Sequence, residues 1–253
     1  TDDAIYRRVL EAVTELIDED CHRTFRSYLA TQVYRANNGT KLVLPPGHDL
    51  LSVTSLKTDS DGDEDYDDTW SASTDYVLEP VNAPNERRPY RSIRQKTNGT
   101  YSFPTNVAGV QLIGKFGFWE ALETSPSTTA EVLDATETDV DVTAGTDFDV
   151  LDTILVESEQ IYVTAIVTNT LTGVRGVNGT TAATHVTASV IQRYQYPAPV
   201  VEACGIQAGR ILVRKNSPLG VLGSADVGFT RLVARLDPDV QLLLNPYRLL
   251  VVA

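Results

Sequence analysis

The chain has 253 residues and a formal net charge of -13, and 42% of its residues are hydrophobic. This length allows one large domain or two modest ones, with enough apolar residues for a core. The acidic balance argues against a protein that grips nucleic acid over a broad surface, because phosphate binding needs an excess of Lys and Arg. No apolar run approaches the roughly 18 residues that span a bilayer, and no basic start precedes an apolar stretch, so we expect neither a membrane span nor a secretory signal.

The first segment is predicted to be a long helix. Asp2 or Asp3 can cap it, and apolar residues then recur at helical spacing. These residues are Ile5, Val9, Val13, Leu16/Ile17, Cys21, Phe25 and Tyr28/Leu29. Such a stripe buries one face of a helix, so we expect these side chains in the core and not at a cofactor.

After Ala30 the pattern becomes typical of β-strands. Two short strands are predicted around Asn38-Gly39, because Asn-Gly is the preferred pair for a tight hairpin turn. Strand-like density of Val, Thr, Leu and aromatic residues continues in "DLLSVTSLKT", "TWSASTDYVLEP" and "GVQLIGKFGFW". Strand–turn–strand units of this spacing imply a small antiparallel sheet packed by the first helix.

From about Ser125 the composition shifts toward Thr, Asp and small residues, with almost no basic side chains. The stretch that follows predicts three or four strands, with turns at Asn169 and Asn178-Gly179. Residues 125–196 are therefore expected to form a separate small β-barrel or sandwich, which at roughly 70 residues could hold a modest core of its own.

Helical patterns return near the end of the sequence. Pro199 suits a first helical turn, and a stripe follows at Val200, Cys204, Ala208 and Ile211/Leu212. A last short helix is predicted to begin at Asp237-Pro238 and to stop before Pro246.

The expected fold class is therefore α+β. A helical body, made of the long N-terminal helix and the C-terminal helices, is interrupted by antiparallel β hairpins and by a small inserted β-barrel or sandwich module. The expected domains are 1–124 for the N-terminal helix and hairpins, 125–196 for the inserted module, and 197–253 for the C-terminal helices and tail.

The acidic stretch "KTDSDGDEDYDD" is the most conspicuous part of the sequence. Asp59, Asp61 and Asp63 match the first three ligand positions of a calcium-binding EF-hand loop. The position that requires Gly holds Glu64, however, and the position that requires a bidentate carboxylate holds Trp70. We therefore interpret the stretch as an exposed hairpin tip between Lys57 and Thr69, with a calcium site of another kind as the alternative.

Two smaller sets of residues leave alternatives open. Cys21 and Cys204, the only cysteines, lie on predicted helical stripes and are interpreted as buried free thiols, although a disulfide could form in oxidising surroundings. The Asn-Gly-Thr triplets at Asn38, Asn98 and Asn178 match the glycosylation sequence and are interpreted as turns.

The sequence gives no positive support for an enzyme. His22, His48 and His185 are far apart and form no metal-ligand pair. Nucleophile elbows, Walker loops and dinucleotide-binding glycine motifs are absent from the sequence. We expect neither catalytic residues nor a metal or other cofactor.

The last residues, "YRLLVVA", include four consecutive apolar side chains from Leu249 to Val252. Such a run is costly to expose. It either packs on its own domain or adds as a strand, or as a plug, to another subunit.

Two blocks resemble the head–tail connector (adaptor) proteins of tailed bacteriophages. The first runs from Leu42 to Ile93 and contains "LVLPPGHDLLSVTSLKTDSDGDEDYDDTW" and "YVLEPVNAP". The second runs from Gln207 to Leu249 and contains "SPLGVLG" and "DPDVQLLLNPYR". With the β module, which is similar to one inserted in phage structural proteins, the resemblance covers most of the chain.

The resemblance implies a structural virion protein. Members of the family form an oligomeric ring, typically a dodecamer, which joins the portal of the phage head to the stopper or tail-completion protein and extends the DNA channel. The partners expected are further copies of the chain, the portal protein, the stopper and the passing double-stranded DNA, which is not bound sequence-specifically. The expected location is the neck of the virion, and the host cytoplasm during assembly.

In this family the C-terminal segment is associated with portal contact. The positions that correspond here are Leu243, Leu244, Asn245, Pro246, Tyr247, Arg248, Leu249, Leu250, Val251 and Val252. The inserted module would be an outward decoration or an extra contact between subunits. The alternative function is a calcium-dependent carbohydrate-binding or adhesin-like β module, which the β content and the acidic stretch support.

Overall fold

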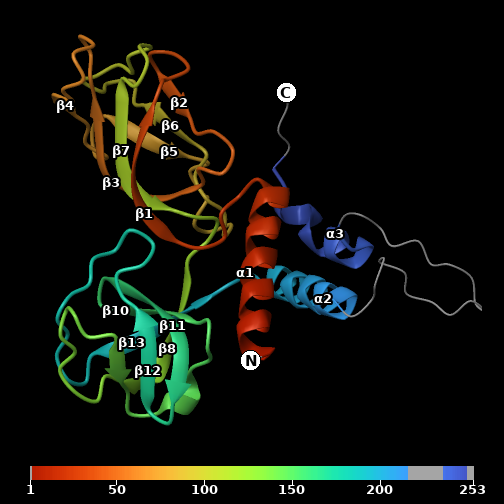
Figure 1. Cartoon of the computed structure of the whole chain (residues 1–253). Coiled ribbons are helices and arrows are strands. Elements are labelled where there is room, and N and C mark those ends of the chain that lie inside the picture. The colour runs from red at the N-terminus through yellow and green to blue at the C-terminus, as the bar shows by residue number, and fades with distance from the viewer. Residues whose placement is uncertain (1, 216–235, 250–253) are drawn as a thin grey trace, which may run out of the picture. The chain divides into compact units, whose positions relative to one another are not determined.

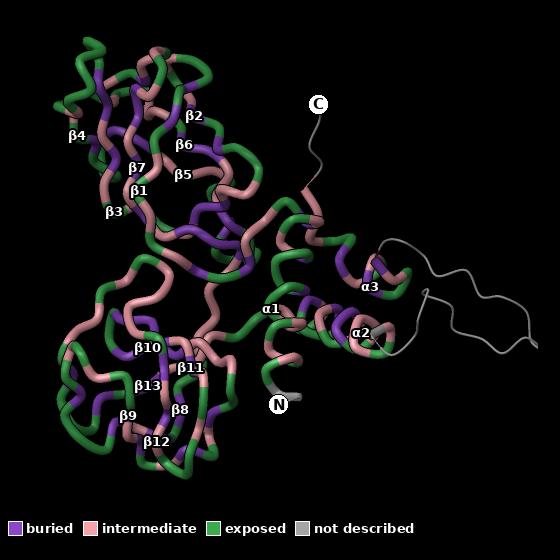
Figure 2. Tube along the Cα trace, in the orientation of Figure 1, coloured by how far each residue is buried: buried purple, intermediate pink, exposed green. Residues whose placement is uncertain are grey.

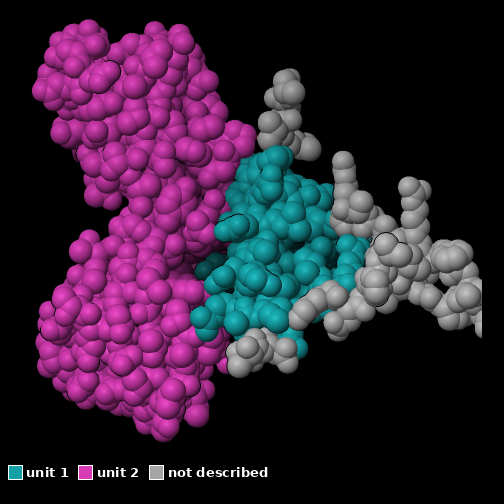
Figure 3. All heavy atoms as spheres, viewed as in Figure 1, with its two compact units in different colours: residues 1–23, 196–253 teal, residues 24–195 magenta. Residues whose placement is uncertain are grey.

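The computed structural model describes residues 2–215 and 236–249, and they fall into two compact units (Figures 1 and 3). Unit 1 combines Thr1–Arg23 with Tyr196–Ala253, and unit 2 comprises Thr24–Gln195. Both ends of the sequence therefore contribute to one unit, while the middle of the chain forms the other.

Unit 1 is helical in its described part, and its helices begin close to the predicted positions. The elements are α1 (Asp2–Cys21), α2 (Ala198–Lys215), α3 (Pro238–Leu244) and the short 3-10 helix η3 (Asn245–Tyr247). Helix α2 contacts both α1 and α3. The buried residues of the predicted stripes include Val13, Ile17 and Cys21 on α1 and Val200 on α2.

Helix α1 ends earlier than the apolar stripe predicts. His22 takes a left-handed conformation with φ of 52°. The N–H groups of His22 and Arg23 then donate to the carbonyls of Glu19 and Asp18 at 3.1 and 3.0 Å. This is the Schellman arrangement that usually has Gly at its left-handed position. Because His occupies this position, the sequence lacks the Gly that usually marks the end of a helix. Tyr28 and Leu29, which the stripe assigned to the helix, belong to strand β1 instead.

The first part of unit 2 contains two antiparallel sheets. One has the strand order β1-β7-β3-β4 and the other has the order β2-β6-β5. The strands are β1 (Tyr28–Tyr34), β2 (Lys41–Val43), β3 (Leu50–Thr58), β4 (Asp68–Thr69), β5 (Tyr76–Glu79), β6 (Ser92–Gln95) and β7 (Val110–Phe116).

The core of this part lies between its own strands and loops. Every member of its buried cluster falls between Tyr34 and Phe116, and the largest include Leu42, Leu50, Leu56, Ile93, Leu112 and Phe116. The rings of Trp70 and Phe103 stack with centroids 4.3 Å apart. Residues from the second sheet and from the loops fill this core, and the first helix belongs to the other compact unit.

The second part of unit 2 is a six-stranded antiparallel sheet with the order β8-β13-β10-β11-β12-β9. Its strands are β8 (Ala121–Thr128), β9 (Asp139–Asp141), β10 (Thr153–Val156), β11 (Glu159–Val167), β12 (Thr170–Val174) and β13 (Val190–Gln195), and a 3-10 turn, η1 (Gly145–Asp147), lies between β9 and β10. Its separate core contains Leu133, Val140, Val142, Phe148, Ile154, Val156, Ile161, Val163, Leu171 and Ile191. Along β10 and β12 buried positions alternate with intermediate ones, which are purple and pink in Figure 2.

The two β parts of unit 2 are joined by hydrogen bonds. The side chain of Gln160, which is 2% exposed, donates from Nε2 to the Ser27 carbonyl at 3.1 Å and accepts from Asn178 Nδ2 at 2.8 Å. The N–H of Leu29 donates to the Asn178 carbonyl at 2.8 Å. The predicted turn at Asn178-Gly179 is thus hydrogen-bonded to the start of β1.

The predicted fold class is wrong because it makes helices the main body of the protein. Among the described residues 34% are in strands and 21% in helices, arranged as three helices and three antiparallel sheets. The protein is therefore mostly β, and not a helical body with a small inserted β module. The physical reason is that the β segments bury their apolar residues against each other in two cores, so they need no helical layer to cover them.

Candidate functional site

The predicted docking segment lies on the helical unit. Leu243 and Leu244 end α3, Asn245–Tyr247 form η3, and Arg248 and Leu249 follow. Leu244 is fully buried, whereas Asn245 and Pro246 are exposed. Leu250, Val251 and Val252 lie outside the described residues.

Helix α3 forms as its sequence predicts. Asp237 caps it by accepting the N–H of Asp239 at 2.9 Å, and Pro238 occupies the first turn. The side chain of Gln241 donates back to the Leu236 carbonyl at 2.8 Å. Arg210 on α2 forms an ion pair with Asp237. Both the cap and the preceding turn are therefore held, which gives the docking segment a defined start.

The segment after α3 is fastened to the C-terminal end of α1. Arg23 donates to the Tyr247 carbonyl at 2.5 Å, and Arg248 donates through Nε to Asp20 at 2.7 Å. The N–H of Leu249 donates at 3.0 Å to the carbonyl of Cys21, one of the carbonyls that a helix end leaves unpaired. The two guanidinium groups also lie where cations are favourable, at the negative end of the helix dipole.

Up to Leu249 this segment packs on its own unit, whereas most of the apolar run on which the two interpretations depend lies outside the described residues. Leu242, the residue of α3 just before this segment, is 71% exposed. The contact of this segment with a portal stays a prediction.

The two cysteines of unit 1 are free thiols. Cys21 is buried and Cys204 is half-buried. Burial raises the pKa of Cys21 to about 12, and the charge of Asp20 adds to that shift. Burial likewise raises the pKa of Cys204, whose sulfur lies 4.0 Å from Thr14 Oγ1. Because a thiolate is the reactive form, neither environment suits a nucleophile.

The acidic stretch is a hairpin tip, as predicted. Strands β3 and β4 pair Lys57 with Thr69 and Thr58 with Asp68, so the stretch joins two antiparallel strands. Asp59 is 2% exposed. Its carboxylate accepts the N–H groups of Gly62 and Glu64 at 2.7 and 2.9 Å. Asp59 therefore closes the loop from inside.

Carboxylate oxygens of Asp59, Asp61 and Asp63 lie within 4.8 Å of one another. The hydrogen bond from Gly62 N–H holds the pKa of Asp59 below its ordinary value, despite partial desolvation. The charge of Asp63 raises the pKa of Asp61. Two of the three carboxylates are exposed, and the third already has main-chain partners, so the cluster offers oxygen ligands but no closed cation cage.

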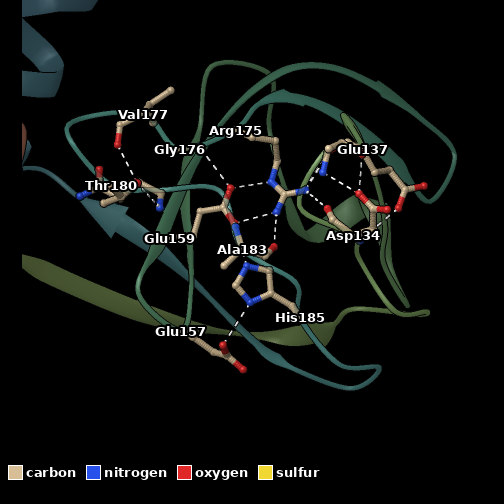
Figure 4. A network of polar contacts seen from close by, with 12 residues as sticks. Asp134, Glu137, Glu157, Glu159, Arg175, Gly176, Val177, Thr180, Ala183 and His185 are labelled. Atoms are coloured by element: carbon tan, nitrogen blue, oxygen red, sulfur yellow. Dashed lines mark hydrogen bonds and ion pairs between the residues drawn. The ribbon is translucent and has the colours of Figure 1, made fainter.

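The most completely bonded polar cluster is a network in the six-stranded sheet that sequence reasoning missed (Figure 4). Arg175, which follows β12, donates through Nε and Nη2 to the two carboxylate oxygens of Glu159 at 2.5 and 2.7 Å. Its remaining donors reach the carbonyls of Asp134, Glu137 and Ala183 at 2.7 to 2.8 Å. All five N–H groups of the guanidinium are therefore used.

Glu159 is equally well satisfied. It also accepts the N–H groups of Gly176 and Ala183 at 3.1 and 3.0 Å, and it lies 2.8 Å from Nε2 of His185. Its side chain and that of His185 are both 0% exposed. Burial raises the pKa of Glu159, but the hydrogen bonds of Arg175, Ala183 and His185 outweigh burial and leave the pKa below its ordinary value.

This network holds structure together and does not offer a reaction site. Both charged partners are enclosed, and the contacts tie β11 and β12 to the segments around Asp134 and Ala183. One feature of the sequence could have indicated this network. Arg175 and Arg193 are the only Lys or Arg residues between positions 121 and 195, and a lone cation among carboxylates is a natural ion-pair partner.

The three histidines have different surroundings. His22 ends α1. His48 accepts or donates to the Tyr34 hydroxyl at 2.8 Å, and burial, helped by the charge of Arg91, lowers its pKa. His185 belongs to the buried network. In the part of the chain that is described, the only cluster of possible metal ligands is the one at Asp59, Asp61 and Asp63.

Comparisons with known proteins add no family. No family model, no curated protein and no solved structure matches the chain. No helix among the described residues is both long enough and apolar enough to cross a membrane. Functional inference therefore rests on the molecule itself.

Proposed function

We propose that this chain is a non-enzymatic structural protein of a tailed-phage virion. It forms a ring of identical copies that joins the portal of the head to the stopper or tail, and it extends the channel through which DNA passes. It acts in the virion neck and assembles in the host cytoplasm.

One observation carries the proposal, namely the fastening of the segment 245–249 to the end of α1. The hydrogen bonds of Tyr247, Arg248 and Leu249 set the position and direction of the main chain on that helix. An apolar run that leaves a rigid helix from a set point is suited to docking, because less conformational entropy is lost on binding than from a free tail.

The charge of the chain agrees with a channel-lining role. A net charge of -13 disfavours the multiple phosphate contacts that would slow moving DNA. Exposed apolar residues on the helical unit, namely Val201, Val213 and Leu242 at 54%, 55% and 71% exposure, supply surface that copies or partners could cover.

The test mixes the purified chain with a portal ring and images the mixture by negative stain. The expected result is an added ring on one end of the portal. A variant lacking residues 250–253 keeps every anchoring contact described above and should lose portal binding while its melting temperature is unchanged. Portal binding at full strength by this variant would refute the docking role of the apolar run.

The matched control is Val167→Ser, a change at an exposed site in the six-stranded sheet, where the side chain is 70% exposed. It removes one exposed apolar side chain from the other unit and should leave portal binding intact. Equal loss in both variants would point to non-specific adhesion.

A calcium-dependent binding module remains the second candidate, because three carboxylates gather at the β3–β4 tip. Calorimetry with calcium tests it directly. Tight binding that disappears in both Asp61→Ala and Asp63→Ala would favour this function over the ring.

A further inference from the structure

Three Asn-Gly-Thr triplets, at Asn38, Asn98 and Asn178, share one local sequence in three different surroundings. In an Asn-Gly pair the main-chain nitrogen of the glycine can attack the side-chain carboxamide of the asparagine, because glycine has no side chain that hinders the approach. The reaction needs an available Gly nitrogen, a positioned carboxamide and freedom for the main chain to move. Since the triplets are identical, differences in their reactivity come from the fold.

At Asn38 the surroundings favour the reaction. Asn38 and Lys41 close a two-residue turn, with their main-chain groups paired at 3.3 and 3.4 Å. The carboxamide oxygen of Asn38 accepts the N–H of Thr40 at 3.0 Å and its hydroxyl at 2.9 Å. Asn38 is exposed, and the N–H of Gly39 has no acceptor among the described residues. The carbonyl of Gly39 accepts the N–H of Phe103 at 2.9 Å, while the Gly39 nitrogen is free and the carboxamide is held in place.

At Asn98 the nucleophile is engaged. The N–H of Gly99 donates to the Lys96 carbonyl at 2.9 Å. Gly99 also lies so close to Asp75 that a Cβ on it would stand 2.8 Å from the Asp75 carbonyl oxygen. Ring closure would require this contact to open.

At Asn178 the carboxamide and the main chain are both clamped. Its Nδ2 donates to Gln160 at 2.8 Å, and its carbonyl accepts the N–H of Leu29 at 2.8 Å. A Cβ on Gly179 would stand 2.1 Å from the Leu29 carbonyl oxygen, so the turn cannot shift toward β1. The leaving nitrogen is thus tethered at the joint between the two β parts.

We propose that Asn38 is a site of spontaneous succinimide formation, which converts it to aspartate and isoaspartate while Asn98 and Asn178 persist. The Gly39 nitrogen gives up its proton to solvent base and attacks Cγ of Asn38, forming a C–N bond. The bond from Cγ to Nδ2 then breaks, and Nδ2 takes up a proton and leaves as ammonia. Water adds to either carbonyl of the ring and opens it, with no change in oxidation state.

Thr40 contributes to this reactivity. Negative charge develops on Oδ1 of Asn38 as the nitrogen attacks, and the N–H and hydroxyl of Thr40 already point at that atom. Donors placed in advance where charge develops stabilise the transition state. Isoaspartate formation inserts one more main-chain carbon at the corner between β1 and β2.

The test incubates the full chain at mildly alkaline pH and follows the three sites by tryptic peptide mapping. Cleavage after Arg35, Lys41, Lys96, Lys115, Arg175 and Arg193 puts the triplets in separate peptides. Fragmentation distinguishes Asn38 from Asn37, and each conversion adds about one dalton. We expect Asn38 to convert at least about ten-fold faster than the other two sites, since each of those must first break ordinary hydrogen bonds.

Two comparisons make the result decisive. In urea, where the fold is lost, the three rates should converge. Thr40→Val removes one donor and should slow conversion of Asn38 about five-fold, whereas Thr100→Val, the same change beside Asn98, should leave the Asn98 rate unaltered. Circular dichroism checks that both variants fold.

Equal rates at the three sites in the folded chain would overturn the proposal, as would faster conversion at Asn98. An unchanged Asn38 rate in folded Thr40→Val would overturn the role of the threonine hydroxyl. The outcome does not depend on whether the chain binds a portal.

Discussion

Replacing Arg175 by methionine should destabilise unit 2 strongly. Methionine keeps most of the side-chain length but removes all five donors, so Glu159 loses two charge-assisted hydrogen bonds while it remains 0% exposed. The carbonyls of Asp134, Glu137 and Ala183 lose partners as well. Removing one partner of a buried ion pair costs about 3–5 kcal/mol, because an uncompensated charge is left behind.

We therefore expect Arg175→Met to lower the free energy of unfolding by about 4 kcal/mol. In a unit of 150–250 residues each kcal/mol corresponds to about 2–4 °C, so the melting temperature should fall by about 8–16 °C. Urea unfolding followed by circular dichroism and a calorimetric scan measure the two quantities independently.

The control is Arg193→Met, in the same sheet. Arg193 lies 3.5 Å from Glu123 and 3.7 Å from Asp152, with its side chain 27% exposed. Ion pairs at the surface contribute about 0–1 kcal/mol. A loss below about 1 kcal/mol for Arg175→Met, or equal losses for the two variants, would refute the argument that the enclosed network holds this sheet together.

A double-mutant cycle separates the pair from its surroundings. Combining Glu159→Gln with Arg175→Met removes both charges, so the double variant should be less destabilised than the sum of the single variants. Strict additivity would mean that the two side chains stabilise the sheet independently.

Three further predictions follow from charge and burial. Hydrogen bonds from Arg94 and then Lys41 hold the pKa of Glu79 down to about 2, so its ion pairs stabilise the fold above the ordinary Glu pKa, near 4.3. Glu79→Gln should therefore lower the melting temperature at neutral pH, and the difference from the parent protein should vanish as pH falls toward about 2; a difference that persists there would contradict the assignment. Asp59→Ala should lower the melting temperature because two main-chain N–H groups lose their acceptor. Asp61→Ala should leave the melting temperature unchanged, or raise it by relieving repulsion. Thermal-shift measurements compare the two variants, and a larger fall in melting temperature for Asp61→Ala would show that the inner carboxylate does not close the loop. Burial raises the pKa of Cys21 to about 12, so this thiol should not react with an alkylating agent near pH 8 until the protein is unfolded. Mass spectrometry that shows rapid labelling of the folded chain would contradict this prediction.

Local patterns anticipated the elements well where the deciding contacts are close in sequence. The Asp237-Pro238 pair predicts the start of α3 because a cap and a first-turn proline act over two or three residues. The acidic stretch predicts a hairpin tip because its flanks pair directly, Lys57 with Thr69. The end of α1 was missed because His22 occupies a position where Gly is the usual signal.

The segment from Leu243 to Val252 was predicted to dock from its apolar run and from the family resemblance, yet its anchoring at the end of α1 could not be foreseen. Arg23 and Arg248 lie 225 positions apart in the sequence, and only the packing of the first helix beside the last segment brings both to one helix end. The Arg175 network was missed for the same reason, since its members come from four separate segments.

The sequence alone determined where the helices at both ends of the chain begin, several of the strands between them and the sites of the tight turns, because periodicity, caps and Asn-Gly pairs act over a few residues. Only the tertiary structure decided which strands pair, such as β1 with β7, where Tyr28 lies opposite Phe116. It also decided that the sheets bury their apolar faces in two cores of their own, and that among the three identical Asn-Gly-Thr triplets the carboxamide is held by distant segments at Asn178 but by its own turn at Asn38. These outcomes depend on contacts between distant segments, whose energies no local pattern encodes.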